Sequence, residues 1–330
     1  GDNVTIKFNS SYIKDYYSLL GKNEHGITVK GDLLIDDYYY EKKSVEEAES
    51  EYVKKCVQGL LNKSKLKEKD INLFIGGDLQ SELIASDFGM KNFNIPFLGV
   101  YSACSTFTES LLIASVFVEN KRVKNVGVVT SSHNLVSEKQ FRFPLELGNQ
   151  RPPTSQWTVT GAGSAILSKC GNGPYVTYIT TGKVIDMGIK DANNMGAAMA
   201  PAALDTLIAH FKDTGRNPSY YDAILTGDLG HIGKEILTEL AETKSYNIKA
   251  NYNDCGVLMF DKATQDTHSG GSGCACCATI FSGYLFNKLK QKELKKILLI
   301  ATGALTNATS NQQGESIPGI AHAIAIETDI

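Results

Sequence analysis

Hydrophobic residues along this chain of 330 residues follow two alternating patterns. Short runs rich in β-branched residues predict buried strands, and longer segments with apolar residues three or four positions apart predict amphipathic helices. The expected strands are 71–77, 123–132, 162–169, 221–227, 255–261 and 295–303. The expected helices are 44–63, 106–121, 202–215, 233–244 and 277–290. This alternation favours an α/β fold in which helices and sheet pack in layers.

The chain also contains an internal repeat. The run INLFIGGDL at 71–79 resembles YDAILTGDL at 221–229, and residues 103–132 align without a gap with residues 275–304. Each copy of the longer match predicts a turn of small residues, a helix, a basic connector and a buried strand. We therefore predict a duplication, with a ligand cleft where the two halves meet near the ends of their strands. The two halves are expected to span residues 1–170 and 171–330.

Composition and charge exclude several classes of protein. The net charge is −3 at pH 7, so we expect no nucleic-acid partner. The longest apolar runs fall short of the roughly 20 residues of a spanning helix, and no signal peptide is expected. Seven cysteines, three of them in the run CACC, do not form the pattern of a secreted disulfide framework and indicate a reducing compartment. We expect no metal site and no cofactor, because CACC lacks the paired spacing of a zinc site.

Cys104 is the first candidate for chemistry. It follows the apolar run FLGVY at 97–101 and precedes the helix expected at 106–121. Unpaired N–H groups and the dipole of a helix lower the pKa of a thiol at the helix N-terminus and favour the nucleophilic thiolate. The sequence thus leaves two alternatives, a working acyl-transfer nucleophile or a cysteine retained from one.

The repeat and the cysteine at the start of the first core helix resemble the thiolase-like fold, which includes thiolases and the condensing enzymes of fatty-acid synthesis. A closer resemblance covers nearly the whole chain. It is carried by GVYSACST, TSSHN, QFRFP, GNQRPPTSQWTVTGAGSAILSK, TGDLGHIG and SGGSGCACC. These segments resemble the stage V sporulation protein AD family of endospore-forming bacteria. The resemblance implies a thiolase-like fold and binding of dipicolinic acid (pyridine-2,6-dicarboxylate), which the family helps to move, usually with calcium, into the developing spore.

The resemblance also provides a test for catalysis. In thiolase-like acyltransferases the second half supplies a His, and often an Asn, whose hydrogen bonds stabilise negative charge on the acyl group. Here Gly227 and Asp228 follow the matching strand, and His231 comes later, on the first turn of the next helix. The turn SGGSGCA places Gly270 near the position of the Asn. An Asp beside the thiol would raise its pKa. We therefore predict a pocket inherited from an enzyme and now used for binding, with Cys104 in its lining.

Two arginines are candidates for binding a dicarboxylate. Arg142 and Arg151 flank the run FPLELGNQ, and a guanidinium group binds carboxylates in a bidentate manner. They could instead pin a long loop to the body or to a partner subunit. His133 follows a strand end, where it could donate to a carboxylate or cap a loop. His231 with Asp228 could polarise a ligand.

Two further residues have a structural alternative. Asp228 is interpreted as an N-cap of the helix that follows it, because the same GDL recurs at 77–79, far from any proposed chemistry. Trp157 could stack on a pyridine ring, although packing between the halves is the favoured interpretation. The complete set of expected ligand-binding residues is Cys104, His133, Arg142, Arg151, Thr160, Asp228, His231, Gly270 and Ser272.

The leading hypothesis is a non-catalytic protein that binds dipicolinic acid, alone or as its calcium chelate, during uptake into the spore. The alternative is a thiolase-type acyltransferase with Cys104 as nucleophile and His231 or His133 as base. A third possibility is a scaffold whose pocket is vestigial. The resemblance also implies a homodimer, other stage V A-operon proteins as partners, and a peripheral location at the inner membrane of the forespore or spore.

Overall fold

One long sheet organises the molecule. The computed structural model describes residues 2–24, 28–120, 122–141 and 151–329, and within them eleven strands form this sheet. Its order is β10-β9-β12-β13-β8-β1-β7-β5-β3-β4, with β2 paired to β1. The strands are β1 (Thr5–Leu20), β2 (Leu33–Leu34), β3 (Leu73–Gly77), β4 (Phe97–Gly99), β5 (Asn125–Ser132), β7 (Gly161–Ser168), β8 (Tyr175–Thr180), β9 (Ala223–Thr226), β10 (Tyr252–Asp254), β12 (Lys296–Ala304) and β13 (Gly319–Glu327).

The strand order has the same pattern when read from either end. β1 and β8 are antiparallel neighbours at the centre. On one side β7 is antiparallel to β1 and β5, and β5, β3 and β4 are parallel. On the other side β13 is antiparallel to β8 and β12, and β12, β9 and β10 are parallel. A duplicated chain would give this arrangement. The predicted boundary between the two halves, near residue 170, stays a prediction.

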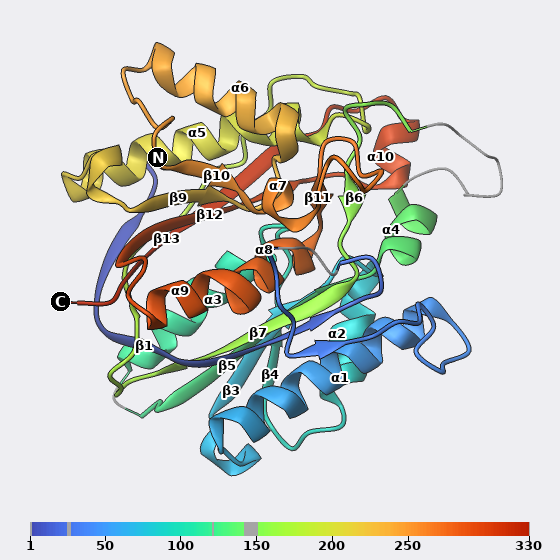
Figure 1. The fold of residues 1–330 in the computed structure, drawn as a ribbon, viewed down its shortest axis with the longest axis vertical. Helices are drawn as coiled ribbons and strands as arrows, with labels where there is room; N and C mark the ends of the chain where they lie inside the picture. Colours follow the sequence, from blue (N-terminus) through green and yellow to red (C-terminus); the bar gives the residue numbers. More distant parts are fainter. Residues whose placement is uncertain (1, 25–27, 121, 142–150, 330) are drawn as a thin grey trace.

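Helices lie in layers on both faces of the sheet (Figure 1). α5 and α6 cover one half, α1 and α2 cover the other, and α3, α8 and α9 lie between the halves. α3 packs on β5 and β1 on one side and on β12 and β13 on the other. The helices are α1 (Val45–Ser64), α2 (Ile84–Met90), α3 (Thr106–Glu119), α4 (Asn134–Phe141), α5 (Met195–Thr214), α6 (Gly230–Thr243), α7 (Cys255–Met259), α8 (Cys274–Ile280), α9 (Phe286–Lys290) and α10 (Ala308–Gln312).

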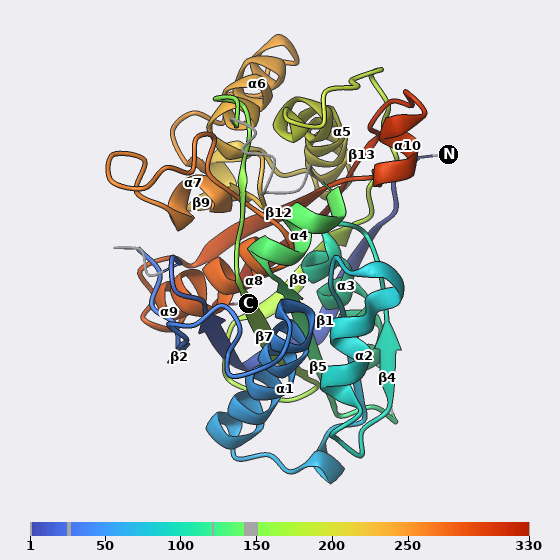
Figure 2. The same cartoon turned by 90° about the vertical axis from the view of Figure 1, so that its right-hand side faces the viewer.

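A short ribbon joins the two halves near the site. Its strands, β6 (Trp157–Thr158) and β11 (Gly271–Ser272), are parallel, and β11 leads directly into α8. The view in Figure 2 shows α4 between α5 and α6 above and α1 and α2 below. The ribbon and α4 therefore bring segments from both halves together at one place.

The expected elements are confirmed except at 255–261. The strand there is shorter and earlier, at β10, and the apolar run is the helix α7. The carboxylate of Asp254 accepts a hydrogen bond from the N–H of Val257, which caps α7 and explains why this apolar run is helical. The sequence interpretation also missed β1, β8 and β13. No helix in the described ranges has the length and apolar character needed to cross a membrane.

Candidate functional site

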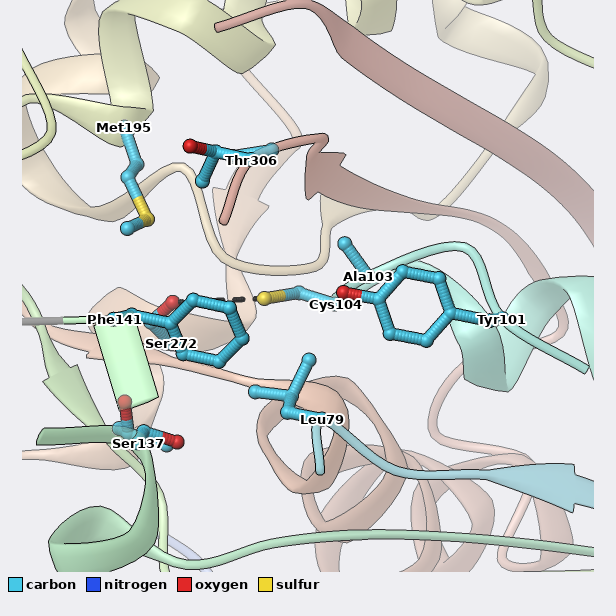
Figure 3. A pocket seen from close by; sticks show the side chains of 11 residues that line it. Leu79, Tyr101, Ala103, Cys104, Ser137, Phe141, Met195, Ser272 and Thr306 are labelled. Carbon is cyan, nitrogen blue, oxygen red and sulfur yellow. Dashed lines mark hydrogen bonds between the residues drawn. The ribbon is translucent and has the colours of Figure 1, made fainter. Parts of the chain in front are cut away.

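A small chamber of about 30 Å³ lies where the turn before α3 meets the β6–β11 ribbon. The thiol of Cys104 lies inside it, with Phe141 and Tyr101 on opposite sides of the sulfur and Leu79 between them in this view (Figure 3). Its lining comes from segments far apart in the chain. The lining residues are Leu79, Tyr101, Ala103, Cys104, Ser137, Phe141, Thr158, Met195, Ser272, Ala304 and Thr306.

The turn that carries Cys104 is tight. Ala103 has a φ of 47°, in the left-handed region, and Ser105 is the N-cap residue of α3. Cys104 thus lies just before the helix, as expected. The expectation from the helix N-terminus alone would be a lowered pKa. Instead, burial raises the pKa of the Cys104 thiol well above its ordinary value, and the negative charge of Asp228 adds to the shift.

Asp228 lies behind the thiol and is fully buried. One carboxylate oxygen accepts a hydrogen bond from the hydroxyl of Thr302 (2.7 Å). The other accepts from the hydroxyl of Ser272 (2.8 Å) and from the N–H of Gly273 (3.1 Å). Cys104 Sγ lies 3.8 Å from Ser272 Oγ. Because Ser272 gives its proton to Asp228, the thiol is left to donate to Ser272, which keeps the sulfur protonated.

The interpretation of Asp228 as a helix cap is wrong. Leu229 is the N-cap residue of α6 and makes no side-chain cap. The first N–H groups of this turn, those of Leu229 and Gly230, donate instead to the carboxylate of Asp254. Asp228 is therefore free to bind the turn that carries Ser272.

The earlier GDL, at 77–79, is not far from the site. Leu79 lines the chamber. Asp78 accepts hydrogen bonds from the N–H groups of Gln80 and Ser86, so it holds its own turn together. The expectation that this copy is remote from the chemistry is therefore wrong, although its aspartate does have the structural role that was expected.

An open groove of about 530 Å³ lies outside the chamber. The two cavities share four lining residues, which form the neck between them: Leu79, Tyr101, Phe141 and Thr306. The rest of the groove is lined by Gln80, Ser81, Glu82, Leu83, Gln140, Leu305, Asn307 and Ser310. The sequence analysis missed these residues. Except for Gln140, which lies in α4, the available signal was their position in the segments after the C-terminal ends of β3 and β12, where ligands bind in α/β folds.

His133 and Thr160 are not part of the chamber lining. The Nε2–H of His133 donates to the carbonyl of Tyr38 (2.9 Å), and Nδ1 accepts from the N–H of Leu135 (3.2 Å). Burial lowers the pKa of His133 to about 4, so the ring is neutral and both of its nitrogens are occupied. The hydroxyl of Thr160 accepts from the N–H of Asn134.

His231 and Gly270 also lie outside the chamber lining. His231 is on the first turn of α6, as expected, where its N–H donates to the carbonyl of Ser269. Burial lowers the pKa of its imidazole, and nearby lysines lower it further. The carbonyl of Gly270 accepts from the N–H of Trp157. From this turn it is Ser272, two residues later, that faces the thiol.

Arg151 belongs to a different pocket. Its guanidinium lies 4.9 Å from the ring centre of Trp157 and donates to the carbonyl of Asp266 (2.6 Å). Arg151 and Trp157 line a pocket of about 380 Å³. Side chains alternate between the faces of a strand, so Trp157 faces this pocket while Thr158 faces the chamber. Arg142 lies outside the described residues and follows Phe141 in the sequence.

A metal centre built by the chain alone has no support in the described ranges. They hold no group of three or more His, Cys, Asp or Glu side chains that could bind a metal ion. The three cysteines of CACC are buried and free of disulfide bonds.

Comparisons with known proteins identify relatives along the whole chain. The family model "Stage V sporulation protein AD (SpoVAD)" matches residues 2–327. Stage V sporulation protein AD of Bacillus subtilis (strain 168) is 40% identical over 296 residues, which are 90% of this chain and 87% of that protein. Among solved structures, a variant of Xanthomonas campestris OleA matches with a TM-score of 0.64 at 13% identity, covering 98% of this chain and 99% of that chain. The 3-oxoacyl-[acyl-carrier-protein] synthase III of Aquifex aeolicus VF5 matches with a TM-score of 0.54 at 13% identity, covering 96% and 99%. These two structures establish the thiolase-like fold.

Proposed function

Since the chain belongs to the stage V sporulation protein AD family, we propose that its groove and chamber bind dipicolinic acid as the calcium chelate, for uptake into the developing spore. The surroundings of Cys104 are the observation that favours binding over acyl transfer. The thiol is buried and faces Ser272 and Asp228, where an acyltransferase needs hydrogen-bond donors to a developing negative charge.

The charge at this position argues against a working nucleophile. A thioester forms by attack of the thiolate, and both burial and Asp228 raise the pKa of the Cys104 thiol. An oxyanion would also lie beside the Asp228 carboxylate and be destabilised by it. The same groups are compatible with a neutral ligand placed against the thiol.

The sizes of the two cavities support a position of the ligand ring in the groove. A dry cavity of about 150 Å³ accommodates one benzene ring. The chamber, at about 30 Å³, is close to the size of one water molecule, whereas the groove has about 530 Å³. A pyridine ring therefore fits in the groove against the neck, with the chamber beyond it.

The groove lining favours the calcium chelate. Calcium binds six to eight oxygen ligands, among them amide carbonyls, hydroxyls, carboxylates and water. Pyridine-2,6-dicarboxylate fills only part of this shell with its carboxylates and ring nitrogen. Gln80, Glu82 and Asn307 line the groove. The Oδ1 of Asn307 accepts from the N–H of Ser310, and the buried amide of Gln80 donates to Glu49. The exposed carboxylate of Glu82 is therefore the oxygen ligand that the lining offers to the calcium ion. Glu82 would repel the free dianion, whereas the chelate carries no net charge.

Isothermal titration tests the proposal. Titrating the purified protein with pyridine-2,6-dicarboxylate plus calcium should give saturable binding, weaker binding without calcium, and none with pyridine-3,5-dicarboxylate. Glu82→Gln should weaken binding of the chelate more than that of the free acid. Absence of binding with and without calcium would contradict the proposal.

A thiolase-type acyltransferase is the alternative, favoured by the presence of a cysteine at the start of α3 in a thiolase-like fold. Incubation with acetyl-CoA separates the two functions. A covalent mass increase on Cys104 that disappears in Cys104→Ala would establish the acyltransferase. The non-catalytic assignment predicts no such adduct.

We also propose a homodimer joined at β4, with other stage V A-operon proteins as membrane partners. β4 is the last strand of the sheet, and Leu98 on it and Ile84 and Phe88 on the neighbouring α2 are exposed. Light scattering after size exclusion should find a dimer that Leu98→Asp dissociates. Met187→Asp, at an exposed apolar residue in another loop, is the control and should leave the dimer intact. A monomer in the unsubstituted protein would contradict the proposal.

A further inference from the structure

We propose that Tyr101 and Phe141 form an aromatic clamp at the neck between groove and chamber, and that this clamp selects planar rings over puckered ones. The inference rests on the proposed function, because it assumes a cyclic dicarboxylate in the groove. It adds the residues that determine which ring shape is accepted.

The two rings come from opposite sides of the site. Tyr101 is in the turn between β4 and α3, and Phe141 is the last residue of α4. Both line the chamber and also the groove, so both lie where one cavity opens into the other. Figure 3 shows them on either side of the Cys104 thiol, with Leu79 between them. A ligand ring in the groove beside these shared residues therefore lies next to both rings.

Two aromatic rings and a leucine favour a flat, apolar surface on the ligand. Aromatic pairs prefer offset-stacked or edge-to-face contacts, which stabilise them beyond the burial of their area. A pyridine ring carrying two carboxylates can make such contacts with its ring faces and edges. A saturated ring with the same substituents presents axial hydrogens instead and cannot stack.

Tyr101 also has a polar end. Tyr101 is 47% exposed, and the partial burial of its phenol raises the pKa further above neutrality, so the hydroxyl stays protonated near neutral pH. It can therefore donate a hydrogen bond to a ligand carboxylate while its ring contacts the ligand ring. Tyr101→Phe keeps the ring and removes the hydroxyl, which separates the two contributions.

The experiment compares two ligands that differ in ring shape. Pyridine-2,6-dicarboxylate and cis-piperidine-2,6-dicarboxylate both carry two carboxylates beside a ring nitrogen, but only the first is planar. The piperidine nitrogen is also a protonated amine at neutral pH, which weakens calcium chelation. The deciding quantity is therefore the change that each variant makes in the ratio of the two Kd values. Kd is measured by isothermal titration with calcium for the unsubstituted protein, Phe141→Leu, Tyr101→Leu and Tyr101→Phe. Tyr39→Leu removes an exposed ring that is not part of either lining and is the matched control. Circular dichroism checks that each variant is folded.

We expect the unsubstituted protein to prefer the planar ligand by about tenfold or more, the size of one to two stacking contacts. Phe141→Leu and Tyr101→Leu should each weaken binding of the planar ligand by about 5- to 10-fold and change binding of the puckered ligand by less than about twofold. Tyr101→Phe should retain the preference for the planar ring. Tyr39→Leu should change neither Kd.

Two results would overturn the clamp and leave the proposed function standing. These are equal affinity of the unsubstituted protein for both ligands, and leucine variants that weaken both ligands alike. Failure of the unsubstituted protein to bind pyridine-2,6-dicarboxylate with calcium would instead contradict the proposed function itself. If a leucine variant does not fold, the other variant and the ligand comparison in the unsubstituted protein still decide the question.

Discussion

Burial raises the pKa of the Asp228 carboxyl, while hydrogen bonds from Thr302, Ser272 and Gly273 oppose this shift and favour the ionised form. Replacing Asp228 by Asn removes the charge of this form beside the Cys104 thiol and keeps the size of the side chain. The amide oxygen can accept from Ser272 and Gly273 in place of one carboxylate oxygen. The amide NH₂ can donate to the hydroxyl oxygen of Thr302, which turns its own proton elsewhere. Since these hydrogen bonds can be kept, Asp228→Asn is expected to fold.

The size of the effect follows from the distances. Cys104 Sγ lies 3.8 Å from Ser272 Oγ, which lies 2.8 Å from the carboxylate of Asp228. These two contacts limit the separation of the charges to about 6.6 Å, at which like charges repel by about 2.5 kcal/mol at an effective dielectric constant of about 20. About 1.4 kcal/mol is a factor of ten in population, so even half of this repulsion changes the thiolate population about tenfold. Removing the charge should therefore speed alkylation of Cys104 by about tenfold or more.

The assay is alkylation by iodoacetamide between pH 7 and pH 9, followed by peptide mass mapping. Cys170 is exposed and serves as the internal reference. The thiol should be equally buried in the variant and in the unsubstituted protein, so the limited access of the reagent cancels when the two alkylation rates are compared. Ser272→Ala keeps the charge of Asp228 and is the control, with alkylation expected to stay slow. Equal rates for Cys104 and Cys170 in the unsubstituted protein, or no acceleration in Asp228→Asn, would refute the reasoning.

Three further predictions follow from buried or closely packed groups. Burial raises the pKa of Glu24 from 4.5 to about 7. The free energy of unfolding should therefore be highest below pH 4.5 and fall by about 3 kcal/mol as the pH rises to 7. Glu24→Gln should flatten this part of the pH dependence, measured by urea unfolding. A Cβ on Gly163 would clash with the backbone of Ala278, so Gly163→Ala should destabilise the fold by about 3 kcal/mol, and an unchanged Tm would contradict this. Arg151→Gln should leave Kd for the chelate within about twofold, because Arg151 lies beside Trp157 in another pocket, and calorimetry would reveal a larger effect.

The sequence could locate most elements because their burial has a clear period. It missed β1, whose sequence TIKFNSSYIKDYYSLL mixes hydroxyl, charged and aromatic residues. Central position in the sheet, between β7 and β8, stabilises this strand, and that information is not local. The apolar run at 255–261 was ambiguous for the opposite reason, because a short buried run fits either a strand or a helix until its cap is known.

For the site, the sequence located Cys104 and Ser272 because they lie in the two turns that face each other. It could not indicate side-chain direction. His133 follows a strand end, as a ligand-binding residue would, but its ring packs on Tyr52 and binds the backbone of Tyr38. Gln80, Glu82 and Asn307 form the groove without any motif, because only the fold brings the loops after β3 and β12 together.

The repeated GDL turn has different roles in the two halves. In the first copy Asp78 binds the N–H groups of Gln80 and Ser86 and so shapes the loop that forms one wall of the groove. In the second copy the aspartate, Asp228, reaches out of its own turn to Ser272, next to the thiol. The same local sequence thus builds the groove in one half and sets the charge of the chamber in the other. Substitution of Asp78 should therefore act on ligand affinity through the groove, whereas substitution of Asp228 acts on the reactivity of Cys104.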